Sequence, residues 1–294
     1  MRHMKGIMIT SKNSARHPLL LTLAALAFAV ILSACSENTF PDNSFAVIAN
    51  ADIGTGQSRI QIGVVSPEGE RLGSRDDPIS VEIAPTDGSI GPTTYQAEWM
   101  WLIEDVVGLY KTEADLSAPG VWALSVVPEN GPNLPPTPLQ VLDPTLAPNV
   151  GDPAPTAPTD TLATKPLDEL TTDPTPDEGF YQMTLEEAFA SGRKTVVVFS
   201  TPAFCQTATC GPTLEIVKGV RPEFPDANFI HIEVYTDINA PKFSPTPEFL
   251  APALGPEYWN LPSEPWVFVV DEGGLVGARF EGALTLDDLR ESLS

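Results

Sequence analysis

The stretch TVVVFSTPAFCQTATCGPTLEIV (195–217) combines a strand, a turn with two cysteines and the start of a helix. The apolar run 196–199 predicts a buried strand. Cys205 and Cys210 follow in the turn. A helix is expected to begin near Gly211, because Pro212 is tolerated only in the first helical turn. The two cysteines therefore lie between a strand and the beginning of a helix, where an enzyme could place a reactive thiol.

The elements predicted around this stretch have a recognisable order over residues 180–294. A helix over 184–190 comes first, with Thr184 and Glu187 spaced as a capping box. After the cysteine turn come a strand over 228–237, a strand over 266–271 preceded by Pro265, a hairpin and a last helix. A loop–helix region over 240–261 separates the strands 228–237 and 266–271. From the strand 195–200 onward, the order β-α-β-α-β-β-α resembles the thioredoxin fold. The resemblance implies a cis form for Pro265, placed against a pair of redox-active cysteines.

Thioredoxin-type chemistry needs a thiolate at a helix N-terminus, where the free amides and the helix dipole lower the thiol pKa. Cys210 lies nearer the expected start of the helix, which favours it as the thiolate. Measured from the preceding strand, Cys205 instead takes the attacking position. The sequence therefore leaves open which of the two cysteines attacks.

Several residues depart from the thioredoxin pattern. The pair is spaced Cys-x4-Cys rather than Cys-x2-Cys, and Thr213 stands where a Cys-Gly-Pro-Cys motif ends. The strand 196–199 lacks the buried acid of thioredoxins, and Phe204 replaces their tryptophan. Glu264 precedes Pro265, and its charge would raise a nearby thiol pKa if it faced the cysteines.

Charge and composition restrict the partners. The chain has 16 basic and 39 acidic residues, a formal net charge of −23. Nucleic acids need a basic surface, so we expect no nucleic-acid partner.

The first residues carry an export signal. Residues 1–34 have a basic start and an apolar run of signal-peptide length, too short for a membrane span. They end in Leu-Ser-Ala before Cys35, which resembles the lipobox of bacterial lipoproteins. The resemblance implies that Cys35 is the lipid-attachment residue and that the chain is anchored on the extracytoplasmic face of the cell membrane, in the periplasm or on the cell surface. Disulfides persist there, and Cys205 and Cys210 remain as an even pair.

The expected fold class is multi-domain. A tether over 35–44 precedes residues 45–142, which read as about seven short strands and resemble an immunoglobulin-like all-β sandwich. A Pro-rich linker is predicted over 143–179, with NVGDPAP (149–155) resembling the lead-in of redoxin-type thioredoxin folds. The α/β thioredoxin-like domain occupies 180–294.

The leading hypothesis is a thiol–disulfide oxidoreductase that acts on exported proteins with thiols or disulfides, with Cys205, Cys210 and Pro265 as its site and no cofactor. Three alternatives remain open. One is a scaffold or binding lipoprotein with a structural disulfide. Another is a copper-binding assembly factor, for which His231 is the one histidine beyond the signal peptide. The third is a peroxiredoxin, whose partner arginine the sequence does not place, with Arg279 as a guess.

Overall fold

The computed structural model describes residues 38–205 and 209–294. The predicted signal peptide and the lipid-attachment residue Cys35 lie outside these ranges. Within them, no helix is both long enough and apolar enough to cross a membrane. Residues Asn38–Ser294 form one compact unit.

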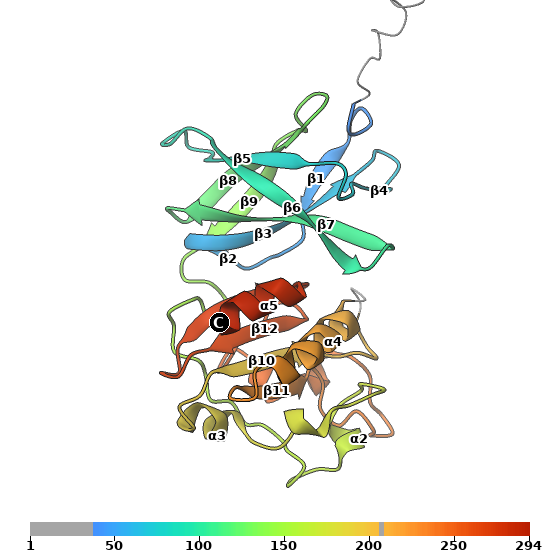
Figure 1. The fold of residues 1–294 in the computed structure, drawn as a ribbon, viewed down its shortest axis with the longest axis vertical. Coiled ribbons are helices and arrows are strands. Elements are labelled where there is room, and N and C mark those ends of the chain that lie inside the picture. The colour runs from blue at the N-terminus through green and yellow to red at the C-terminus, as the bar shows by residue number, and fades with distance from the viewer. Residues whose placement is uncertain (1–37, 206–208) are drawn as a thin grey trace, which may run out of the picture. The chain divides into compact units, whose positions relative to one another are not determined.

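The N-terminal part of this unit is built from β-strands, as predicted (Figure 1). All seven predicted strands are present, and two further strands of two residues each join them. The strands are β1 (Phe45–Ile48), β2 (Ile53–Gly54), β3 (Gly56–Val65), β4 (Arg71–Leu72), β5 (Ile79–Pro85), β6 (Thr93–Ile103), β7 (Val107–Leu116), β8 (Gly120–Pro128) and β9 (Thr137–Leu142).

These strands form one curled sheet in the order β1-β3-β7-β6-β5-β8-β9-β2, with β4 paired to β3. Strand β6 joins its two halves, because residues 93–97 pair with β5 and residues 98–103 pair with β7. Alternate residues point into a shared core, as Ile79, Val81 and Ile83 do on β5. The prediction of an all-β N-terminal part is therefore confirmed.

A second, four-stranded sheet lies in the C-terminal part, in the order β11-β10-β12-β13. Strands β10 and β11 are parallel, whereas β12 is antiparallel to both β10 and β13. Every residue of β10, β11 and β12 is buried. Burial on both faces explains why β12 is apolar throughout and why 196–199 of β10 is an apolar run. The bounds are β10 (Thr195–Ser200), β11 (Asn228–Glu233), β12 (Trp266–Val270) and β13 (Val276–Glu281).

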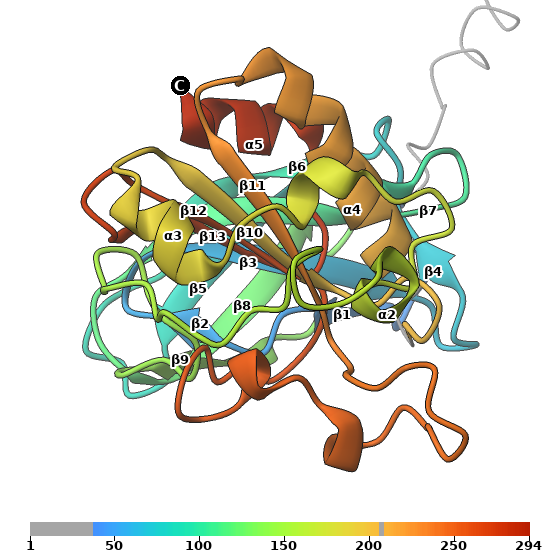
Figure 2. The ribbon, with the colours of Figure 1, turned by 90° about the horizontal axis from the view of Figure 1, so that it is seen from below.

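Helices cover both faces of this sheet. Leu214 of α4 and Leu289 of α5 pack in one core with Val196 and other residues of one face. Leu185 of α3 packs with Val197 on the opposite face. Figure 2 shows α3 apart from α4 and α5. The helices are α2 (Leu167–Leu170), α3 (Leu185–Ala190), α4 (Cys210–Val220) and α5 (Leu286–Leu293), with 3-10 turns η1 (Glu178–Phe180), η2 (Arg221–Glu223), η3 (Pro247–Phe249) and η4 (Pro252–Leu254).

The segment predicted as a Pro-rich linker, 143–179, packs extensively on the C-terminal sheet. Ala147 and Ala157 belong to one of its cores, and Leu170 belongs to the other. The backbone of Gly151 donates to the carbonyl of Val276 at 2.8 Å, which attaches this segment to β13. Its small and apolar residues therefore contribute to the fold of the C-terminal part.

Charged groups connect the two sheets. Asp288 of α5 accepts from Arg59 at 2.9 Å and from Lys111 at 2.6 Å, both on strands of the N-terminal sheet. Arg279 of β13 donates to Asp52 at 2.7 Å. The carboxylate of Glu281 accepts from the backbone amides of Ala51 and Asp52 at 3.0–3.1 Å. These contacts join β13 and α5 to the N-terminal sheet.

Candidate functional site

The candidate site begins where β10 ends. Ser200 is the last buried residue of that strand, and the chain then turns through Pro202 and Phe204 to reach Cys205. Helix α4 begins at Cys210, slightly earlier than predicted, and Pro212 falls in its first turn as expected. The local sequence thus places both cysteines at the N-terminus of α4.

Cys205 and Cys210 form a disulfide, with their Cα atoms 5.9 Å apart. This separation is within the usual range for a disulfide. Cys210 is completely buried, whereas Cys205 is partly exposed. The backbone amide of Cys210 donates a hydrogen bond to Cys205 Sγ at 3.2 Å. The helix therefore directs its first amide at the sulfur of the more accessible cysteine.

This geometry bears on which cysteine could attack. The sequence favoured Cys210 because of its position near the helix start, but its sulfur is buried and Cys210 is itself the first residue of α4. A thiolate at Cys205 would receive both the amide hydrogen bond and the favourable end of the helix dipole. Exposure and hydrogen bonding both favour Cys205 as the nucleophile.

Pro265 lies directly before β12, and its peptide bond with Glu264 is cis. Trp266, the next residue, pairs with Phe199 on β10, so Pro265 lies at the same end of the sheet as the turn that leads to the cysteines. The carbonyl oxygen of Pro265 accepts a hydrogen bond from the backbone amide of Gly282 at 2.8 Å. The third predicted site residue therefore immediately precedes the strand adjacent to β10.

An aromatic patch borders Cys205. The ring of Phe204 lies 5.0 Å from that of Phe243 and 6.2 Å from that of Tyr235, and Phe243 lies 5.3 Å from Phe249. We call these four residues the aromatic patch. Three of them come from the long connection between β11 and β12, which extends away from the sheet in Figure 2. Burial raises the pKa of Glu264, which precedes Pro265. The pKa of Tyr235 is raised first by burial and then by the charge of Glu264.

The buried side chain of His231, on β11, contacts the last residue of β10, Ser200. His231 Nε2 is 3.0 Å from the carbonyl oxygen of Ser200, and its Nδ1 is 2.6 Å from the hydroxyl of Tyr181. A neutral ring that donates from Nε2 and accepts at Nδ1 satisfies both contacts. Burial lowers the pKa of His231 to about 4, so the ring is neutral near pH 7.

Glu233 is a buried acid that the sequence analysis missed. Burial raises the pKa of its carboxyl. Glu233 accepts from the amide and the hydroxyl of Thr172, both at 2.8 Å, and the same hydroxyl accepts from the amide of Ala203 at 3.1 Å. It thus fixes the turn two residues before Cys205. The available signal was an acidic residue at the end of an otherwise apolar strand.

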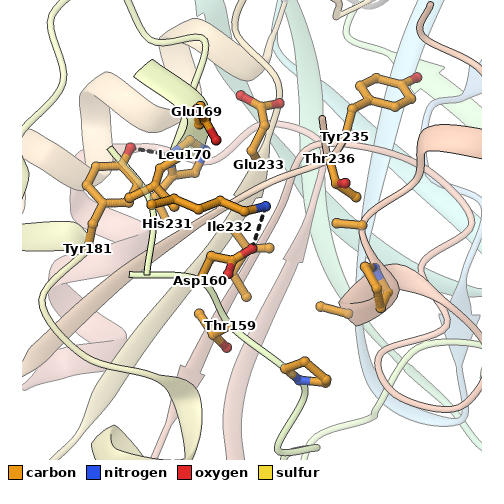
Figure 3. A pocket seen from close by; sticks show the side chains of 15 residues that line it. Thr159, Asp160, Glu169, Leu170, Tyr181, His231, Ile232, Glu233, Tyr235 and Thr236 are labelled. Carbon is orange, nitrogen blue, oxygen red and sulfur yellow. Dashed lines mark hydrogen bonds and ion pairs between the residues drawn. The ribbon is translucent and has the colours of Figure 1, made fainter. Parts of the chain in front are cut away.

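A cavity of about 210 Å³ is lined in part by His231 and Glu233. Figure 3 shows Tyr181 and His231 on one side of it and Tyr235 on the other. An ion pair between Lys165 and Asp160, 2.9 Å long, forms part of its wall. Tyr235 belongs both to this wall and to the aromatic patch, so the cavity and the surface beside Cys205 are neighbours.

The structure shows the contacts of the two side chains considered for the copper-binding and peroxiredoxin alternatives. Among residues 38–205 and 209–294, no three His, Cys, Asp or Glu side chains are grouped to hold a metal ion. His231, the histidine considered for the copper alternative, is engaged with Tyr181 and Ser200. Arg279, the arginine considered for a peroxiredoxin, pairs with Asp52. Both side chains are thus engaged in contacts within the protein.

Comparisons with known proteins give little further information. No family model and no curated protein matches the chain. One solved structure that it resembles is the filamin domain of Lin-41, with 14% identity over 33% of this chain and 91% of that one, at a TM-score of 0.22. A similarity this low supports no inference about fold or function.

Proposed function

We propose that the chain is a membrane-anchored, extracytoplasmic thiol–disulfide oxidoreductase of thioredoxin type. The observation that carries the proposal is the Cys205–Cys210 disulfide at the first turn of α4, where the Cys210 amide donates to Cys205 Sγ. The strand order β11-β10-β12-β13, the helices on both of its faces and the position of Pro265 before β12 support a thioredoxin-like fold.

The proposed reaction oxidises a dithiol substrate. A substrate thiolate attacks Cys205 Sγ, and the Cys205–Cys210 bond breaks to leave a Cys210 thiolate, which takes up a proton. The second substrate thiolate then attacks the substrate sulfur of the mixed disulfide and releases the Cys205 thiolate. Two electrons pass from the substrate to the cysteine pair, and the substrate leaves as a disulfide.

The proposed membrane location rests on the lipobox-like sequence that ends at Cys35. Lipidation there would anchor the protein without a spanning helix, and two acyl chains give stable attachment. The proposed substrates are therefore exported proteins that carry thiols or disulfides. We assign the N-terminal sheet the role of an immunoglobulin-like spacer or docking module between the membrane and the redox site.

One observation favours a second candidate. Because Cys210 is completely buried, the disulfide could serve as a structural link in a binding or scaffold lipoprotein. In that case reduction would be slow, and neither cysteine would exchange readily with a small disulfide.

Single-cysteine variants distinguish the two candidates. In Cys210→Ala, we expect Cys205 to form a mixed disulfide with oxidised glutathione at pH 7, because the α4 amide stabilises its thiolate. In Cys205→Ala, we expect Cys210 to react at least about tenfold more slowly, since it is buried and lacks this contact. The adducts are followed by mass spectrometry. Equal and slow reaction of the two variants would favour the structural disulfide.

A further inference from the structure

The connection between β11 and β12 brings apolar side chains next to Phe204, the residue before Cys205. Phe243 and Phe249 of this connection are only partly buried, as is Phe204 next to Cys205. Leu250 follows them and is 41% exposed. Grouped apolar side chains that stay open to solvent are typical of an interaction surface. Phe204, Phe243 and Phe249 of the aromatic patch therefore offer a contact surface beside Cys205, whereas Tyr235 is buried.

Glu264 adds a charge to this surface. Its carboxyl is about half buried, and burial raises its pKa. In the part of the chain that the structure describes, no hydrogen bond or ion pair links the Glu264 side chain to another residue. Lys242, the single basic residue of residues 234–265, forms no ion pair with it. A partly desolvated carboxylate without a cation is unfavourable, so binding a cation here would recover free energy.

The charge of the whole chain favours the same kind of partner. The formal net charge is −23, and such a field attracts cationic molecules at moderate ionic strength. Glu264 immediately precedes Pro265, at the end of the sheet that leads to the cysteine turn, and its charge acts on Tyr235 of the aromatic patch. A cation on Glu264 would therefore be held on the same side of the sheet as the patch. The patch and the carboxylate together match a polypeptide segment with one apolar and one basic side chain.

We propose that the aromatic patch and Glu264 select the substrate of the exchange reaction, a polypeptide whose cysteine is flanked by an aromatic or aliphatic residue and by Lys or Arg. The apolar side chain packs on Phe204 and Phe243, and the cation pairs with Glu264. This inference rests on the proposed oxidoreductase function, and it specifies the substrate class for that site.

The test uses two dithiol peptides that differ only in a Lys or a Glu beside the first cysteine, each with an adjacent Phe. The exchange rate of the oxidised protein is measured with both peptides and with dithiothreitol, a small neutral dithiol. The variants are Glu264→Gln and Phe243→Ala, and Glu257→Gln is the control because Glu257 is an exposed carboxylate of the same connection.

The wild-type protein should react about fivefold faster with the Lys peptide than with the Glu peptide. Glu264→Gln should abolish this preference, and Phe243→Ala should slow both peptides about fivefold. Each peptide rate is divided by the rate of the same variant with dithiothreitol, so that any change in the reactivity of the disulfide itself cancels. Glu257→Gln should behave as wild type. An unchanged Lys preference in Glu264→Gln would overturn the proposal, and this conservative variant keeps the test valid if Phe243→Ala misfolds.

A binding measurement separates this inference from the proposed function. Fluorescent copies of both peptides with serine in place of cysteine are titrated with the protein, and anisotropy is recorded. Preferential binding of the Lys peptide that depends on Glu264, without exchange by any dithiol, would sustain the docking surface and refute the oxidoreductase. Exchange with dithiothreitol without any peptide preference would refute the docking surface alone.

Discussion

Replacing Asp288 by alanine is expected to lower the free energy of unfolding by about 3 kcal/mol. Asp288 pairs with Arg59 and Lys111, and the side chains of Asp288 and Arg59 are only 9% and 8% exposed. Burial alone would raise the pKa of Asp288, but its hydrogen bonds and ion pairs with the two cations outweigh this and hold the pKa well below its usual range. The variant leaves a buried guanidinium without its carboxylate. We place the loss at the low end for a broken buried pair, because Lys111 also lies 3.7 Å from Glu98.

Asp287 provides a matched control for this experiment. It is the preceding residue of α5, is 85% exposed and pairs with the exposed Arg290. Asp287→Ala should change stability by no more than about 0.5 kcal/mol. Urea unfolding followed by tryptophan fluorescence reports on both sheets, because Trp122 and Trp266 lie in different cores. Equal stabilities for the two variants would show that the contact of Asp288 does not hold the sheets together.

The second large effect is a loss of stability in acid that depends on His231. The ring is completely buried, and its pKa falls from 6.5 to about 4 in the folded protein. Between pH 6.5 and about 4, the unfolded chain therefore binds a proton at His231 that the folded chain does not bind. Stability is fully present above pH 6.5 and is lost as the pH falls from 6.5 towards 4, by up to about 3 kcal/mol.

The measurement compares the pH dependence of unfolding in the wild-type protein and in His231→Asn. Glu233 acts in the opposite direction, because its raised pKa adds stability in acid that is lost as the pH rises. Asp173 and Lys218 also influence the ring. Since these groups are present in both proteins, the difference between the two curves isolates His231. Parallel curves between pH 4 and 6.5 would contradict the buried, neutral histidine.

Much of the secondary structure could be predicted from local pattern. The period-two alternation of Ile79, Val81 and Ile83 marks β5, and the apolar run 196–199 marks β10. Strands β2 and β4 escaped prediction because two residues cannot display a period. The packing of Ala147 and Ala157 was also hidden, since isolated small residues among prolines have no periodicity that reveals a partner.

The candidate site could be predicted only in part, and the reason differs from the one that hid strands β2 and β4. The cysteine pair and Pro265 could be recognised by their spacing, but the choice between Cys205 and Cys210 depends on burial and on the direction of one amide, which the three-dimensional structure supplies. The contacts of Glu233 and Asp288 join segments distant in the chain. Sequence reasoning about single elements has no access to such contacts.

The central claim is that Cys205 and Cys210 form an exchangeable pair, and their reduction potential tests it most directly. The fragment 36–294 is equilibrated in glutathione buffers, trapped with an alkylating agent and analysed by mass. We predict a potential between about −120 and −270 mV, the range of thiol–disulfide enzymes. A potential well below about −300 mV would identify a structural disulfide and contradict the oxidoreductase.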